Sequence, residues 1–177
     1  SYGFDNTYVF LVRKDTAEKY GLEKVSDLED VADELTVGAD RAWMTREGDG
    51  YPGFIQEYGF EFDSIYPMQI GLVYDAVAAH RMDVVLGYST DGRIASYDLV
   101  MLEDDRQYFP PYDASPIIND ELAQKDPEVK EAIDRLAGKI DTETMQKMNY
   151  QSDNNLIEPS IVAERFLEKN NYFEDEE

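Results

Sequence analysis

The fold class rests on the stretch Asp83-Val84-Val85-Leu86-Gly87-Tyr88, an apolar run that follows an acidic residue and ends at a tyrosine. A short run that is apolar on both faces is typical of a strand buried inside a sheet. The preceding residues, 71–81, carry apolar side chains at positions 72, 73, 76, 77 and 79, which is helical spacing. A helix that leads directly into a buried strand predicts an α/β protein.

The alternation of strand and helix continues on both sides of this unit. Ser26 and Glu29 have the spacing of a capping box, Gly21 suits the end of a short helix, and Pro52 suits the first turn of another. Helices are therefore predicted at 15–20, 26–35 and 52–58, a polar loop at 41–51, and strands at 8–13, 35–39, 65–69, 99–102 and 115–118.

Beyond residue 118 the pattern becomes helical. Helices are predicted at 126–136, from 141 or 142 onward, and from Pro159 to about 171, and the acidic tail 174–177 is expected to fray. We find no internal repeat and no linker rich in Pro, Gly or Ser. Any boundary between two lobes must therefore be crossed by segments that run directly from one lobe to the other, as in a hinged ligand-binding cleft.

Charge and composition exclude several classes of function. The 177 residues include 16 basic and 39 acidic side chains, which gives a net charge of −23. Such a surface repels nucleic acid and anionic membranes. The absence of Cys and the presence of a single histidine, His80, argue against thiolate chemistry and against sites that need two imidazoles, and no metal or cofactor is predicted. No run of about 18 apolar residues occurs, and residues 1–5 do not have the pattern of a signal peptide.

Tyrosine is the most informative residue type, with 13 among the 177 residues. Tyr8 opens a predicted strand, Tyr88 closes one, and Tyr112 follows Pro110-Pro111 in a stiffened loop. Ligands bind at strand ends in open α/β sheets, so these three tyrosines are candidate ligand contacts. From the pattern alone, a purely structural role for each of them stays open.

Four motifs together resemble the osmoprotectant-binding proteins of ABC importers, which take up glycine betaine, choline, carnitine and related quaternary ammonium compounds. They are Asp5-Asn6-Thr7-Tyr8, Gly87-Tyr88-Ser89-Thr90-Asp91-Gly92, Leu102-Glu103-Asp104-Asp105 with Phe109-Pro110-Pro111-Tyr112, and Leu136-Ala137-Gly138-Lys139-Ile140. The resemblance implies an α/β fold of two lobes, the periplasmic-binding-protein fold of class II. The chain would cross between the lobes near residues 6–8 and 88–90.

Family members have about a hundred residues before the Asn-Thr-Tyr motif, so the chain resembles their carboxy-terminal part. In this interpretation residues 9–88 form the second lobe. Residues 1–8 and 89–177 form the returning part of the first lobe, which is incomplete in this chain. The resemblance also implies an ABC permease as partner and a location outside the cytoplasmic membrane, as a lipoprotein, a soluble periplasmic protein or a fusion to the permease.

In the family, tyrosines form the cage for the ligand, and the matching positions are Tyr8, Tyr88 and Tyr112. Aromatic faces suit a trimethylammonium group, which has no N–H donor and spreads its charge over methyl groups. Arg46 lies at the spacing where some family members hold the ligand carboxylate, and its planar fork suits that group. Asn6 and Thr90 are further polar candidates near the predicted crossings.

Three other readings remain open. The acidic run 103–105 offers carboxylates for an enzyme, but no nucleophile and base stand out, and an enzyme is not predicted. Asp113 and the run 119–121 are rich in oxygen ligands for calcium, yet their spacing matches no EF-hand loop. A related two-lobe effector or solute-binding domain for another small ligand is the third alternative.

Overall fold

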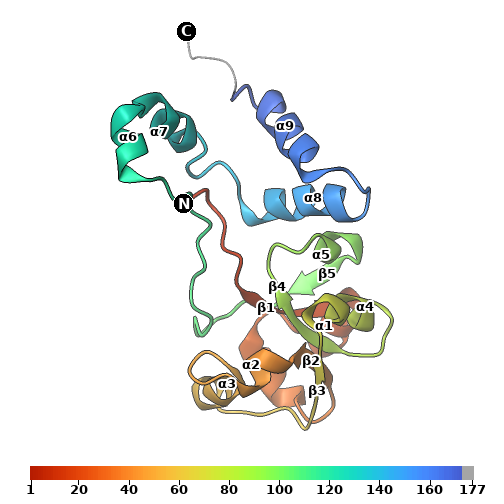
Figure 1. Cartoon of the computed structure of the whole chain (residues 1–177). Helices are drawn as coiled ribbons and strands as arrows, with labels where there is room; N and C mark the ends of the chain where they lie inside the picture. The colour runs from red at the N-terminus through yellow and green to blue at the C-terminus, as the bar shows by residue number, and fades with distance from the viewer. Residues whose placement is uncertain (173–177) are drawn as a thin grey trace.

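A five-stranded mixed sheet forms the centre of the structure, a computed structural model that describes residues 1–172 (Figure 1). Its strands are β1 (Tyr8–Arg13), β2 (Thr36–Asp40), β3 (Ser64–Met68), β4 (Val84–Tyr88) and β5 (Leu99–Met101), in the order β3-β2-β4-β1-β5. β2 is parallel to β3 and β4, whereas β1 is antiparallel to β4 and β5. The start of β1 therefore lies at the carboxyl edge of β4.

Helices cover both faces of the sheet, which explains why its two central strands read as continuous apolar runs. The helical elements are α1 (Lys14–Tyr20), the 3-10 helix η1 (Val25–Val31), α2 (Arg41–Thr45), α3 (Tyr51–Tyr58), η2 (Ile70–Leu72), α4 (Val73–Ala78), α5 (Gly92–Ser96), α6 (Asp120–Lys125), α7 (Pro127–Asp134), α8 (Thr142–Asp153) and α9 (Pro159–Lys169). On one face Phe10 packs among the aromatic residues of α2 and α3. On the other, Leu11 and Val85 belong to the cluster that contains Tyr74 and Val77 of α4.

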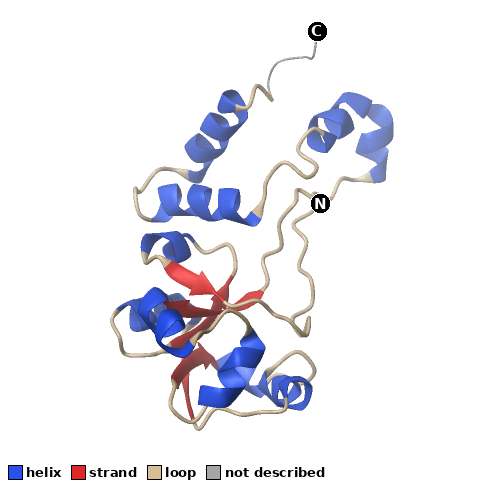
Figure 2. Ribbon diagram, turned by 180° about the vertical axis from the view of Figure 1, so that it is seen from behind, coloured by secondary structure: helices blue, strands red, loops and turns tan. Residues whose placement is uncertain are grey.

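The carboxy-terminal helices lie apart from the sheet, as Figures 1 and 2 show from opposite sides. Two extended segments, 1–7 and 110–118, run side by side between the two regions. The Asn6 amide donates to the Tyr112 carbonyl at 3.1 Å, and the Ala114 amide donates to the Phe4 carbonyl at 3.0 Å. Of the carboxy-terminal helices, α8 returns to the sheet region and packs on α5.

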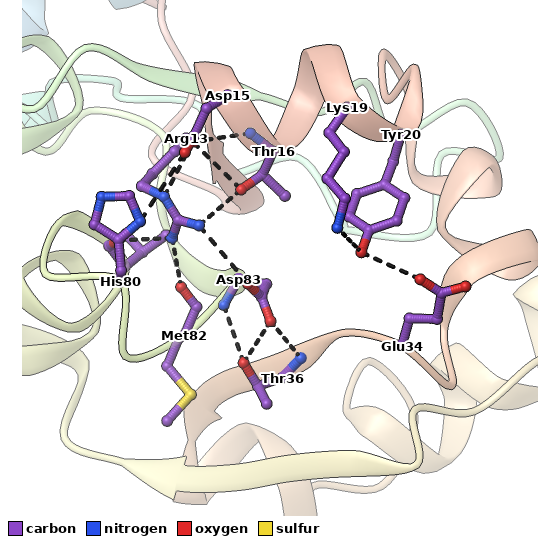
Figure 3. Close-up of polar contacts among 11 residues, drawn as sticks. Arg13, Asp15, Thr16, Lys19, Tyr20, Glu34, Thr36, His80, Met82 and Asp83 are labelled. Atoms are coloured by element: carbon purple, nitrogen blue, oxygen red, sulfur yellow. Dashed lines mark hydrogen bonds and ion pairs between the residues drawn. The ribbon is translucent and has the colours of Figure 1, made fainter.

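At the opposite end of β1, the side chain of Arg13 donates hydrogen bonds to neighbouring elements (Figure 3). Its Nη1 atom donates to the carbonyls of Val77 and Met82 at 2.9 and 2.7 Å, and Nη2 donates to the Thr16 hydroxyl at 2.8 Å. Beside it, the Asp83 carboxylate accepts from both the amide and the hydroxyl of Thr36. These bonds join β1, α1, α4 and β2 at the edge away from Tyr8.

Most predicted elements are confirmed, with small shifts in their bounds. The strands at 8–13, 35–39, 65–69 and 99–102 and the helices at 15–20, 52–58, 71–81, 126–136, 142 onward and 159–171 are all present. Gly21 ends α1 in the left-handed conformation, with φ 68°. The expectation for 174–177 lies outside the described residues.

Three predictions of local structure are wrong, and two helices were not predicted. Residues 25–31 form a 3-10 helix, and its capping box joins Lys24 and Asp27 rather than Ser26 and Glu29. Residues 41–45 form α2 instead of a loop, because the Asp40 side chain accepts from the Trp43 amide and caps a helix there. Residues 115–118 have no strand partner within residues 1–172, and α5 and α6 were not predicted from the sequence.

The path after β4 also differs from the predicted crossing at 88–90. The chain turns there into α5 and then β5, which pairs with β1 in the same sheet, and the segment beside residues 1–7 is 110–118. The division of the chain into lobes at residue 88 stays a prediction.

Within residues 1–172, the structure contains no helix that is both long enough and apolar enough to cross a membrane.

Candidate ligand-binding site

Tyr8 and Tyr88 lie opposite each other at the carboxyl edge of the parallel strands. They are partners in the register of β1 and β4, so their side chains leave the sheet on the same face. Their rings stack with centroids 5.1 Å apart and an interplanar angle of 30°. Tyr8 is buried and Tyr88 is half-buried. The structure thus brings together two of the three predicted cage tyrosines.

Arg46 joins this pair from the loop after α2. Asp40 caps α2, which therefore begins directly after β2. Arg46 follows the last residue of this short helix and lies at the sheet edge. Its Nη2 atom donates to the Tyr8 hydroxyl at 3.2 Å, and its guanidinium carbon lies 5.5 Å from the centroid of the Tyr8 ring. An ion pair of 3.1 Å with Asp49 holds the other side of the guanidinium.

These surroundings keep the Tyr8 hydroxyl protonated. Burial raises the pKa of Tyr8 to about 12, the neighbouring hydroxyl of Tyr88 adds to the increase, and Arg46 opposes it. The hydroxyl is therefore neutral at physiological pH. Asp49 is then the anion that pairs with Arg46, and Tyr8 offers Arg46 a neutral hydroxyl.

Asn6 and Thr90 contact each other rather than the tyrosine pair. The Thr90 hydroxyl donates to the Asn6 side-chain oxygen at 2.8 Å, and Thr90 is buried whereas Asn6 is exposed. The Asn149 side chain of α8 also donates to the Thr90 carbonyl at 2.8 Å. In this structure the Asn6–Thr90 pair joins the segment 1–7 to the turn after β4.

Tyr112 stands apart from the pair. It lies in the segment 110–118, its side chain is 49% exposed, and among the described residues it takes part in no ring contact. Its backbone is fixed, because the carbonyl accepts from the Asn6 amide. The third predicted cage residue thus has a fixed backbone and a free ring.

Two further residues belong to this region although no role was predicted for them from the sequence pattern. Phe109 lies 6.0 Å from the Tyr8 ring and lines a hollow of about 400 Å³ together with Tyr8 and Thr7. Ser89 links three parts of the chain: its hydroxyl donates to the Asp5 carbonyl and accepts from the Thr7 amide, and its carbonyl accepts from Gln146 of α8. Both residues lie inside motifs quoted above, but their contacts form between segments that are far apart in the sequence.

The chemistry available here is recognition of charge by aromatic faces and one guanidinium. An aromatic face attracts a cation, and a guanidinium binds a carboxylate. Among residues 1–172 there is no cluster of three or more His, Asp or Glu side chains arranged to hold a metal ion.

Comparison with known proteins gives the family. Residues 1–169 match the model of the OpuAC family, the substrate-binding domain of ABC-type glycine betaine transport systems. The chain belongs to this family. Because the family model covers nearly the whole chain, the predicted resemblance to osmoprotectant-binding proteins is confirmed.

Among OpuAC-type relatives, the carnitine transport binding protein OpuCC of Listeria monocytogenes is 60% identical over 174 residues, which cover 98% of this chain and 56% of that protein. The ergothioneine transport permease/ergothioneine binding protein EgtU of Helicobacter pylori is 37% identical over 167 residues, 94% of this chain and 30% of that protein. The chain thus spans about half or less of the length of these relatives.

A solved structure of a glycine betaine/carnitine/choline ABC transporter protein superimposes with a TM-score of 0.94 at 56% identity. The match covers 98% of this chain and 64% of that one. The predicted α/β fold class, that of two-lobe periplasmic binding proteins, is confirmed by this likeness.

Proposed function

We propose that this chain is part of a binding protein that captures quaternary ammonium compatible solutes, such as carnitine, glycine betaine and choline, and delivers them to an ABC permease. Support comes from the family, from a carnitine-binding relative at 60% identity, and from the tyrosine pair at the sheet edge. The protein would bind its ligand without transforming it, because the part of the candidate site formed by residues 1–172 offers aromatic faces and a guanidinium but no nucleophile with a base.

The position of Arg46 over the Tyr8 ring is the observation that carries the proposal. A cationic group already occupies this face at 5.5 Å, which is within cation–π range. In the bound state, the trimethylammonium group takes the tyrosine faces, and Arg46 turns to the ligand carboxylate. Tyr112, with its fixed backbone and exposed ring, supplies a third face.

The same arrangement supports a two-lobe mechanism. In this proposal the sheet and its helices form one lobe, and the segments 1–7 and 110–118 cross to the other. The part of the family fold that this chain does not span completes that other lobe, the first lobe of the predicted division. Closure of the cleft then brings Tyr112 and the opposite lobe onto the pair of Tyr8 and Tyr88. Release to a permease outside the cytoplasmic membrane follows when the lobes open, whether the protein is a lipoprotein, free in the periplasm or fused to the permease.

Calorimetry on the full-length protein tests the binding site. Carnitine, glycine betaine or choline should bind with 1:1 stoichiometry. Replacing Tyr8, Tyr88 or Tyr112 by Ala should weaken binding by about 0.5–2 kcal/mol per face, whereas Phe should largely preserve it. Tyr97→Ala is the matched control, because Tyr97 is exposed and bonds to Asp75, away from the pair. Absence of binding at millimolar ligand, or equal losses for Phe and Ala, would refute the cage.

A second candidate ligand is favoured by the relative named for ergothioneine. Ergothioneine also carries a trimethylammonium group and a carboxylate, so the same tyrosine faces and Arg46 suit it. A thermal-shift panel of glycine betaine, carnitine, choline, ergothioneine and amino acids separates the two. Stabilisation by ergothioneine alone would replace the osmoprotectant proposal.

A further inference from the structure

The end of β4 is held by a side chain from the helix beneath it. Tyr74 of α4 is 1% exposed, and its hydroxyl accepts a hydrogen bond of 2.7 Å from the Tyr88 amide. Its ring lies against Gly87, where a Cβ would meet the ring carbon Cε1 at 2.8 Å. Gly87 therefore allows the aromatic ring to approach the strand backbone closely enough for this bond.

The Tyr88 amide has no partner in the strand ladders of residues 1–172, so the Tyr74 hydroxyl is the acceptor that satisfies it. The Ser89 amide donates to the Thr7 carbonyl, so residues 7 and 89 form a hydrogen-bonded pair of the antiparallel ladder. Pairs alternate in such a ladder, so the amide of Tyr88 points away from β1. On that side, pairing of β4 with β2 covers only Val84 and Val85. The Tyr74 hydroxyl takes the place of the missing strand partner.

Tyr74 is itself locked in position by an ion pair. The Arg93 guanidinium lies 4.2 Å from the centroid of its ring, and it binds the Asp91 carboxylate with two bonds, of 2.9 and 2.8 Å. Burial raises the pKa of the Tyr74 hydroxyl above its ordinary value, and proximity to Asp91 adds to this effect. The hydroxyl therefore stays protonated, so that it donates to the Asp91 carboxylate while it accepts from the Tyr88 amide.

We infer that Tyr74 is a positioning residue for the ligand site, which fixes the Gly87–Tyr88 peptide and thereby the direction of the Tyr88 ring. The inference rests on the proposed function, because it gives Tyr88 a ligand to hold. Cation–π attraction depends on the ring facing the cation. Without the hydroxyl, the Tyr88 amide is an unsatisfied donor, and the peptide gains the freedom to rotate toward water.

Tyr74→Phe in the full-length protein tests the inference, because it keeps the ring on Gly87 and removes only the hydroxyl. Amide hydrogen exchange of Tyr88, followed by NMR, should accelerate by about tenfold, the effect of losing one hydrogen bond of ordinary strength. Affinity for glycine betaine should fall by about three- to tenfold. In a Tyr88→Ala background, Tyr74→Phe should cause no further loss of affinity, because its effect passes through that ring.

Tyr51→Phe is the matched control. The Tyr51 hydroxyl accepts a bond of the same length, 2.7 Å, from the Phe62 amide, beside β3 rather than β4. Tyr51→Phe should lower the melting temperature by about as much as Tyr74→Phe does, because each variant removes one acceptor of a backbone amide. It should leave the affinity for glycine betaine unchanged. Unchanged Tyr88 exchange in Tyr74→Phe, or a loss of affinity that persists without the Tyr88 ring, overturns the inference. Failure of the wild-type protein to bind any quaternary ammonium ligand overturns the proposed function instead, and the exchange measurement still decides the role of Tyr74.

Discussion

Arg13 and Arg46 show how one residue type performs different tasks at the two ends of the sheet. Arg13 is directed at backbone carbonyls and closes the edge away from Tyr8. Arg46 is directed at a tyrosine hydroxyl and a carboxylate, and its side chain is one-third exposed. Arg13, the less exposed of the two, therefore contributes to stability, and the more exposed Arg46 is available to a ligand.

Replacing Arg13 tests the first of these roles. Arg13→Met keeps the apolar stem but leaves the Val77 and Met82 carbonyls without their donor. Bonds to a charged donor are worth about 1.5–3 kcal/mol, and the free energy of unfolding in urea should fall by about that amount. Lys14→Met is the control, because the ion pair of Lys14 with Asp98 is exposed and should contribute less than about 1 kcal/mol. Equal losses would show that Arg13 is no more than a surface residue.

Replacing Arg46 discriminates between ligands. If Arg46 binds the ligand carboxylate, Arg46→Ala removes a charge-assisted contact worth about 1.5–3 kcal/mol for glycine betaine. Choline, which has a hydroxyl instead, should bind with little change, as measured by calorimetry. Arg41→Ala, an exposed position on α2, should affect neither ligand. A parallel loss for both ligands would assign Arg46 a role in supporting the Tyr8 ring alone.

At the level of elements, the turn after β4 contacts both α5 and α8. Asp91 caps α5 by accepting from the Arg93 amide, and Gly92 lies so close to α8 that a Cβ would meet the Tyr150 amide nitrogen at 2.5 Å. α5 and α8 can pack together only because this position has no side chain. The turn therefore connects the sheet to the carboxy-terminal helices.

The pH dependence of stability should report on this turn. Burial alone would raise the pKa of the Asp91 carboxyl, but hydrogen bonds from Arg93 and Tyr74 and the charge of Arg93 hold that pKa below its ordinary value. A lowered pKa in the folded state contributes stability above the unfolded pKa of about 3.9, and this contribution is lost as the pH falls through the folded value. Asp91→Asn keeps an oxygen to cap α5 but cannot titrate.

The measurement for Asp91 is the free energy of unfolding at a series of pH values from 7 down to 3. The wild-type protein should lose more stability over this interval than Asp91→Asn. Asp113→Asn, in the segment 110–118, serves as the control and should follow the wild-type curve. Parallel curves for the wild type and Asp91→Asn would mean that the Arg93–Asp91 pair contributes no pH-dependent stability.

Particular elements show why some of the fold is predictable from the sequence and some is not. β1 and β4 are continuous apolar runs, and their burial on both faces makes the pattern unambiguous. Residues 115–118 have a similar composition, yet Ile117 is 99% exposed, because a strand also needs a neighbour and these residues have none. α2 was missed because its start depends on the Asp40 cap and the buried Trp43 more than on periodicity.

The candidate site divides in the same way. Tyr8 begins β1 and Tyr88 ends β4, so both positions could be recognised from the sequence pattern. Their ring stacking depends on the register of β1 against β4, which no local pattern specifies. The same register gives Ser89 its partner on β1, and the packing of α4 against β4 gives Tyr74 its partner, so the sequence pattern indicated a role for neither.

For the whole molecule, the net charge of −23 dominates the long-range electrostatic contribution to stability. Like charges are closer together in the folded state than in the unfolded chain, so self-repulsion lowers stability, and salt screens it over a Debye length of about 10 Å at 0.1 M. Raising NaCl from 0.05 to 0.5 M should therefore raise the melting temperature. Sorbitol at equal osmolality provides the control for general solute effects. A melting temperature that falls with NaCl would mean that specific ion pairs outweigh the repulsion.

The two extended segments 1–7 and 110–118 also determine how the chain could be cut and rejoined. Because they lie side by side, the chain enters the sheet region and leaves it at neighbouring points. Residues 8–109 thus form a loop-like insert with adjacent ends, the arrangement that lets a unit be grafted into a host loop or given new termini without a long spacer. Exchange of this unit between proteins would also have to preserve the packing of α5 on α8, because α8 lies outside residues 8–109.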